Sequence, residues 1–178
     1  MSRLPAILLH VCCAPCAAHP VRALAQRGNV TFFFSNSNIH PLEEYRKREG
    51  EVRRLADIEA VPTIEDEYDH QAWLRETGTW RDEPEGGRRC DACFRYSLGR
   101  AAQVCKERGF DAFTTTLTVS PHKDSARILA IGRELGPFLE IDFKKRDGFR
   151  KSVALSREHE LYRQRYCGCE FSLGRNAQ

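Results

Sequence analysis

The sequence lacks the marks of a membrane-bound or secreted protein. No stretch approaches the roughly 20 apolar residues of a membrane span, and the first residues have neither the apolar run nor the small-residue cleavage site of a signal peptide. The sequence also has no internal repeat and no low-complexity segment. We therefore expect a soluble, cytoplasmic protein that has no membrane partner.

A strong charge of either sign is also missing. The formal net charge is +3, and basic residues gather in short runs such as 46–48 and 144–146. Such runs are usually solvated faces, and contact with phosphate is the alternative. With 178 residues, of which 41% are hydrophobic, the chain can bury one sizeable core but is too short for two large domains. We expect a single domain over residues 1–178.

Apolar runs that alternate with helical patterns predict the secondary structure. Strands are predicted at residues 6–11, 30–34, 61–64, 110–117 and 138–143. Helices are predicted at 20–26, where Pro20 suits the first turn, and at 42–57, 70–76, 90–108, 121–135 and 156–165, where Ser120 is expected to cap the helix that begins at Pro121. The alternation implies a three-layer α/β fold with a mostly parallel sheet that is covered on both faces.

The cysteines carry the strongest functional signal. Seven of the eight fall into three tight groups: Cys12, Cys13 and Cys16; Cys90 and Cys93; Cys167 and Cys169. In a cytoplasmic protein such groups indicate metal binding or redox chemistry rather than structural disulfides. The eighth, Cys105, lies on an apolar helical stripe and is expected to pack in the core.

The first two groups can together supply four thiolates. Cys12 and Cys13 lie just past the carboxyl end of the first predicted strand, before a helix whose N-terminus favours thiolates, and Cys90 and Cys93 begin another helix. Adjacent cysteines do not fit the usual spacing of a zinc site, but Cys13 and Cys16 do. Iron-sulfur clusters and structural zinc both accept four thiolates, so the residues leave both open.

The third group is of a different kind. Cys167 and Cys169 are separated by one glycine, close enough for a small, strained disulfide, and strained pairs are the redox-active ones. The alternative is that they are two more metal ligands from a tail that folds over the site.

Five sequence patterns surround these groups: LLHVCCAPC (8–16), SNSNIHPLEEYRKR (35–48), DEPEGGRRCDACFRYSL (82–98), FTTTLTVSPHKD (113–124) and LYRQRYCGCEFS (161–172). In this order they resemble the QueH family of epoxyqueuosine reductases over almost the whole chain. The resemblance implies reduction of epoxyqueuosine to queuosine at the wobble position of tRNA, without cobalamin. It also implies a fold similar to nucleotide-binding (HUP or PP-loop-like) folds, with the Cys-Gly-Cys tail folded back to the site. No Ser-Gly-Gly phosphate loop is present at 12–16, which argues against use of ATP.

By the same resemblance, a 4Fe-4S cluster would be held by Cys12, Cys13, Cys90 and Cys93, and Cys167 and Cys169 would form a catalytic redox-active pair. Some family members carry a carboxylate in place of Cys16, and either residue type can hold an iron ion. Cys16 is therefore a candidate ligand for an additional iron.

The partners implied are the tRNA anticodon stem-loop that carries epoxyqueuosine and an unidentified electron donor. Aromatic and basic residues near the patterns are candidate tRNA contacts: Tyr45, Arg46, Arg88, Arg89, Phe94, Lys123, Phe149, Arg150 and Arg163. Tyr45 and Phe94 also lie on apolar stripes that predict core packing. Candidate proton donors are His10, His40, Asp91, His122 and Tyr166. The alternative for each of them is a structural role as a capping or hydrogen-bonded loop residue.

Two other functions remain open from the residues. One is a zinc-stapled RNA-binding or adaptor protein without chemistry of its own, and the other is a thiol-disulfide oxidoreductase built around Cys167 and Cys169.

Overall fold

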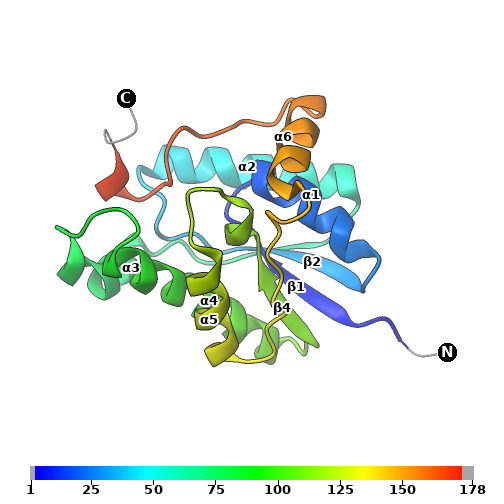
Figure 1. The fold of residues 1–178 in the computed structure, drawn as a ribbon, viewed down its shortest axis with the longest axis horizontal. Helices are drawn as coiled ribbons and strands as arrows, with labels where there is room; N and C mark the ends of the chain where they lie inside the picture. The colour runs from blue at the N-terminus through cyan, green and yellow to red at the C-terminus, as the bar shows by residue number, and fades with distance from the viewer. Residues whose placement is uncertain (1–2, 174–178) are drawn as a thin grey trace.

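A computed structural model describes residues 3–173. The main elements are β1 (Ala6–His10), α1 (Ala14–Ala25), β2 (Asn29–Phe34), α2 (Leu42–Glu59), β3 (Thr63–Glu65), α3 (His70–Thr77), α4 (Arg88–Glu107), β4 (Ala112–Thr115), α5 (Ser125–Leu135) and α6 (Gly148–Glu158). Short 3-10 helices are η1 (Gly78–Trp80), η2 (Thr116–Val119) and η3 (Glu170–Ser172). The prediction of an α/β fold with a parallel sheet is confirmed (Figure 1).

The sheet determines where a site can form. Its order is β3-β2-β1-β4, and every pairing is parallel. The carboxyl ends of the strands therefore share one edge, and the chain leaves β1 and β4, which are neighbours, towards different sides of the sheet. Open α/β sheets bind their ligands in the crevice at such a switch point.

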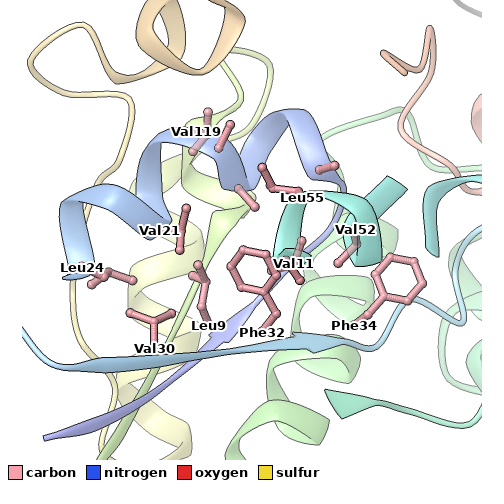
Figure 2. Packing of buried hydrophobic residues seen from close by; sticks show 14 of the residues in the cluster. Leu9, Val11, Val21, Leu24, Val30, Phe32, Phe34, Val52, Leu55 and Val119 are labelled. Atoms are coloured by element: carbon pink, nitrogen blue, oxygen red, sulfur yellow. The ribbon is translucent and has the colours of Figure 1, made fainter. Parts of the chain in front are cut away.

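One face of the sheet is covered by α1, α2 and α6. Figure 2 shows Leu9, Phe32 and Phe34 pointing from the strands towards Val21 of α1 and Leu55 of α2, all of them buried. Because side chains alternate along a strand, β1 and β2 send every second residue to this face. This apolar layer holds α1, and with it the first cysteine group, over the sheet.

The other face is covered by α4 and α5. Leu8 and Phe113 pack from the sheet against Leu98, Cys105 and Ile128 of these helices. Cys105 is fully buried, which confirms its place in the core. The two covered faces complete three layers, as Figure 1 shows with the sheet between the helices.

The prediction of a fifth strand at residues 138–143 is wrong. Only Phe138 forms a bridge, to Phe113 beside it. Beyond that point the hydroxyls of Thr114 and Thr118 donate to the carbonyls of Leu139 and Ile141, at 2.9 and 3.0 Å. Side chains thus take the place of the strand ladder.

Three helix boundaries also differ from the predictions. Helix α1 begins at Ala14 with Pro15 in its first turn, so Pro20 lies inside the helix. Helix α5 begins at Ser125 rather than at 121, because the Asp124 side chain accepts hydrogen bonds from two backbone amides of the first turn. The last α-helix within residues 3–173 is α6, which begins at Gly148 and ends at Glu158, so most of the helix predicted at 156–165 does not form.

None of the helices in residues 3–173 combines the length and the apolar character needed to cross a membrane.

Candidate functional site

The first cysteine group forms a compact cluster at the carboxyl end of β1. Cys12 and Cys13 follow the strand, Cys13 is the N-cap of α1, and Cys16 lies in the first turn of that helix. The sulfurs of Cys12, Cys13 and Cys16 all lie within 4.8 Å of one another. A single tetrahedral ion with metal-sulfur bonds of about 2.3 Å places its thiolates about 3.8 Å apart. The cluster is therefore compact enough for three ligands of one ion.

Hydrogen bonds position two of these sulfurs. The hydroxyl of Thr116, which follows β4, donates to Cys12 Sγ at 3.2 Å and accepts from the Cys12 backbone amide at 3.1 Å. The Gln164 side-chain amide donates to Cys13 Sγ at 2.9 Å. Segments distant in sequence thus converge on the loop after β1.

The three thiols differ in acidity. Hydrogen bonds from Cys12 and Cys16 hold the pKa of Cys13 well below its ordinary value. The same contacts raise the pKa of Cys12, through Cys13, and that of Cys16, through Cys12 and Cys13. Cys13 is therefore the thiol that ionises first and offers a thiolate to a metal.

The second cysteine group lies in the first turns of α4. The Gly86 backbone amide donates to Cys90 Sγ at 3.2 Å. Burial raises the pKa of Cys90, and burial followed by the neighbouring Cys167 raises the pKa of Cys93. The buried indole of Trp73 opposes part of this rise in the pKa of Cys93.

The segment that carries the third group is held by a backbone amide of the loop after β2 and by a side chain of α2. The buried guanidinium of Arg48 donates to the carbonyls of Cys167 and Tyr166, at 3.0 and 3.2 Å. The His40 backbone amide donates to the Gly168 carbonyl at 2.8 Å. Cys169 is buried, and both cysteines of the pair are free thiols.

A cavity of about 530 Å³ lies against these groups. Its wall includes one or more cysteines of each group, namely Cys12, Cys16, Cys93 and Cys167. A smaller cavity of about 50 Å³ shares Cys93 and Cys167 and adds Cys90 and Cys169. A volume in the range of about 300–1,000 Å³ is typical of sites for small molecules, so the larger cavity is large enough for a nucleoside.

Positive charge surrounds the larger cavity. Its wall includes Lys123 and the exposed residues Arg163 and Arg165, together with Phe149, which is 39% exposed. Coulombic attraction to Cys167, acting against burial, raises the pKa of Lys123, so Lys123 is a cation of this wall. The wall thus combines cations with an exposed aromatic ring.

A family model described as "Epoxyqueuosine reductase QueH" matches residues 7–175. A protein of that name from Streptococcus pyogenes is 40% identical, with 94% of this chain and 70% of the relative aligned. Another, from Thermotoga maritima, is 36% identical, with 94% of this chain and 90% of the relative aligned. The chain belongs to the QueH family. Membership confirms the resemblance, and it makes the chain an oxidoreductase.

The seven cysteines of the expected QueH site gather at one end of the sheet. Within residues 3–173, the cluster of three sulfurs does not include Cys90 or Cys93. Cys93 lines both cavities, and Cys90 lines the smaller one. The roles of these cysteines as ligands or redox pair stay predictions.

Burial and partners distinguish the candidate tRNA contacts and proton donors from residues with a structural role. Tyr45 packs against Phe34 and is buried, in keeping with core packing. His10 is buried and lies 3.1 Å from the Ser35 carbonyl, and burial lowers its pKa, so it is a neutral, hydrogen-bonded residue. Asp91 pairs with Arg127.

Among the candidate tRNA contacts, Lys123, Phe149 and Arg163 line the larger cavity, as does Phe94, although Phe94 is mostly buried. Arg89 is buried, and its role as an RNA contact is not supported. Of the candidate proton donors, His10, His122 and Tyr166 lie in the cavity wall.

Sequence reasoning missed three residues that act on the cysteine sulfurs. Thr116 lies within the pattern FTTTLTVSPHKD without a signal that singles it out, and Gln164 and Trp73 carry no sequence signal of a role. Each meets its cysteine across a long stretch of chain, so no local pattern could have paired them.

Proposed function

We propose that this chain reduces epoxyqueuosine to queuosine at the wobble position of tRNA, as the last step of queuosine biosynthesis. The observation that carries the proposal is the convergence of three cysteine groups on one cavity in a chain of the QueH family. We place the reaction in the cytoplasm, where free thiols such as these persist.

We further propose that residues 1–178 form one iron-sulfur oxidoreductase domain, of which residues 1–2 and 174–178 lie outside the described part. The similarity to HUP and PP-loop-like folds, and the folding of the Cys-Gly-Cys tail over the site, belong to this proposal. The Arg48 and His40 contacts to residues 166–168 support the place of the tail.

The proposed ligands of a 4Fe-4S cluster are Cys12, Cys13, Cys90 and Cys93. Four irons take one thiolate each, so their ligands stand farther apart than ligands of a single ion. Two ligands from the loop after β1 and two from α4 would span the cluster, and Cys93 shares a cavity wall with Cys12, although the Cys12 and Cys13 sulfurs, 3.9 Å apart, would have to separate to take one iron each. Cys16 is left for an additional iron, in contact with the same sulfur cluster. When bound, such a centre supplies electrons singly and can polarise the substrate oxygen.

The redox pair completes the electron count. Conversion of an epoxide to an alkene and water consumes two electrons and two protons. Oxidation of the Cys167 and Cys169 dithiol to a disulfide releases two electrons and two protons, so the two half-reactions balance. Cys167 faces the cavity that would hold the epoxide, and the Lys123 cation in the same wall can stabilise negative charge on the departing oxygen.

The cavity rim suits an anticodon loop. Splayed bases stack on aromatic side chains, and backbone phosphates meet arginine or lysine. Phe149 offers an exposed ring, and Arg163 and Arg165 offer guanidinium groups beside it. An electron donor must restore the dithiol after each turnover.

Anaerobic purification with iron and sulfide analysis, followed by assay on tRNA that carries epoxyqueuosine, tests the proposal. We expect a brown protein that forms queuosine. A colourless protein that contains zinc and forms no product would favour an RNA-binding or adaptor role. Turnover of disulfide substrates without any metal would favour a thiol-disulfide oxidoreductase.

A single-turnover experiment tests the pair. Reduced Cys167→Ser protein, freed of other reductants, should give less product than wild type, whereas Cys105→Ala, which changes a cysteine of the core, should give the full yield. Full yield from Cys167→Ser would remove the pair from the mechanism.

A further inference from the structure

Two arginines within residues 3–173 are almost completely buried, and their surroundings differ. Arg48 is 2% exposed and forms an ion pair with Glu44 at 2.7 Å. Arg89 is 1% exposed, and no carboxylate oxygen of residues 3–173 lies within 4.0 Å of its nitrogens. Arg89 is therefore a buried cation that has no acidic partner in the described part of the chain.

The contacts of Arg89 are with neutral groups. Its Nη1 donates to the carbonyls of Arg81, at 2.9 Å, and of Glu83. The guanidinium lies 5.0 Å from the ring centroid of Phe171, and its Nε has no hydrogen-bond partner among residues 3–173. A buried charge is costly unless an opposite charge compensates for it. The carbonyl dipoles orient the group but do not neutralise it.

The nearest source of negative charge is the cysteine site. Arg89 lines the cavity of about 50 Å³ that is also lined by Cys90, Cys93, Cys167 and Cys169. Negative charge on these sulfurs would therefore offset the cost of burying the guanidinium.

Two of the other charged groups of this cavity already have partners. The Asp124 carboxylate accepts two backbone amides of α5, and Arg127 pairs with Asp91. Glu85 and Lys123 also line the cavity. Among these groups, Arg89 is the buried cation without an acidic partner in residues 3–173.

We propose that Arg89 is the counter-charge of the metal centre held by Cys90 and Cys93, and that it raises the reduction potential of that centre. A fixed positive charge stabilises the more negative, reduced form. Arg89 thus acts through the cysteines as a positioning residue and does not contact tRNA. The inference rests on the metal centre of the proposed function.

The reduction potential of the reconstituted protein is the first measurement. At a fixed applied potential, Arg89→Met should lower the ratio of reduced to oxidised centre at least tenfold, which is about 59 mV for a one-electron couple. Arg89→Lys keeps the charge and should recover most of the loss. Arg95→Met removes an arginine of the same helix that is 53% exposed and paired with Glu134, so it should leave the potential unchanged. An Arg89→Met protein with the wild-type potential would overturn the inference.

Melting temperatures of the loaded and metal-free proteins separate this role from a purely structural one. A counter-charge predicts that Arg89→Met lowers the melting temperature more in the loaded form than in the metal-free form. A folded variant that no longer takes up iron and sulfide would support the same conclusion. An equal loss in both forms, or failure to fold in both, would assign Arg89 to the fold and refute the proposal.

The outcome is separable from that of the proposed function. If wild type holds an iron-sulfur centre and the Arg89 variants behave as expected, but no queuosine forms, the counter-charge stands and the reductase proposal fails. If wild type forms queuosine and Arg89→Met changes neither potential nor uptake, the reverse holds. Wild-type protein that takes up no such centre would overturn the counter-charge directly.

Discussion

Replacement of Thr116 by valine tests whether the threonine at the end of β4 supports the metal site. The side chain is fully buried, and its hydroxyl makes two hydrogen bonds to Cys12, one to the sulfur and one from the backbone amide. Valine has nearly the same shape but makes neither bond. The change therefore removes polar contacts and opens no large cavity.

Two effects of different size should follow. Leaving the buried Cys12 amide without an acceptor costs about 1–3 kcal/mol of stability, which lowers the melting temperature by about 2–4 °C per kcal/mol for a domain of this size. If Cys12 is a metal ligand as proposed, loss of the bond to its sulfur should weaken retention of the metal by about 10–100-fold, as other changes behind metal ligands do.

Thr118→Val is the matched control. Thr118 lies in the same 3-10 helix, is also fully buried, and its hydroxyl also makes two hydrogen bonds, to the Ile141 carbonyl at 3.0 Å and from the Phe143 amide at 3.2 Å. It touches no cysteine sulfur in these bonds. The control should therefore lose similar stability but keep its metal.

Thermal unfolding measures the first effect, and the rate of iron loss to a chelator under anaerobic conditions measures the second. We expect similar melting temperatures for the two variants, and faster loss of iron from Thr116→Val alone. Equal rates of loss from both variants, or a wild-type rate from Thr116→Val, would refute it.

Four further changes test the cavity rim, the pH dependence and the fold. Phe149→Ala should weaken binding of an anticodon stem-loop by about 1–3 kcal/mol in fluorescence anisotropy if a base stacks on the ring, and unchanged affinity would exclude stacking. Arg100→Met removes a guanidinium that donates hydrogen bonds to both carboxylate oxygens of Asp66. Burial acts to raise the pKa of that carboxyl, but the contacts with Arg100 outweigh burial, so the net pKa is lowered. The pair therefore stabilises the fold at neutral pH, and the difference in melting temperature between wild type and variant should shrink as the pH falls below about 4. Gly148→Ala would place a Cβ 1.6 Å from a backbone carbonyl oxygen and should lower the melting temperature strongly, whereas Gly50→Ala meets nothing within 4 Å and should stabilise α2 by about 0.5–1 kcal/mol.

Several parts of the fold were predictable because their signals are local. The run AILLH has no alternation, as expected for a central strand covered on both faces, and β1 occupies that position. The helical spacing that placed Cys105 in the core is a property of α4 alone. The position of Cys12 and Cys13 just past β1 followed from the end of the same apolar run.

Boundaries that depend on competing signals were not predictable. Asp124 and Ser120 are both good caps, and the chain uses Asp124 because its carboxylate meets the first turn of α5. The apolar run at 138–143 reads as a strand, but Thr114 and Thr118 take its carbonyls once β4 is in place. Local propensity cannot decide between partners that only the fold supplies.

The sequence by itself determined the alternation of strands and helices, the grouping of the cysteines and the family to which the chain belongs. The tertiary structure alone decided that Thr116 and Gln164 bond the sulfurs of Cys12 and Cys13, and that Arg89 lies inside rather than on the surface. The reason is physical: periodicity and propensity act within one segment, whereas burial and hydrogen-bond partners arise where distant segments pack together at the carboxyl edge of the sheet.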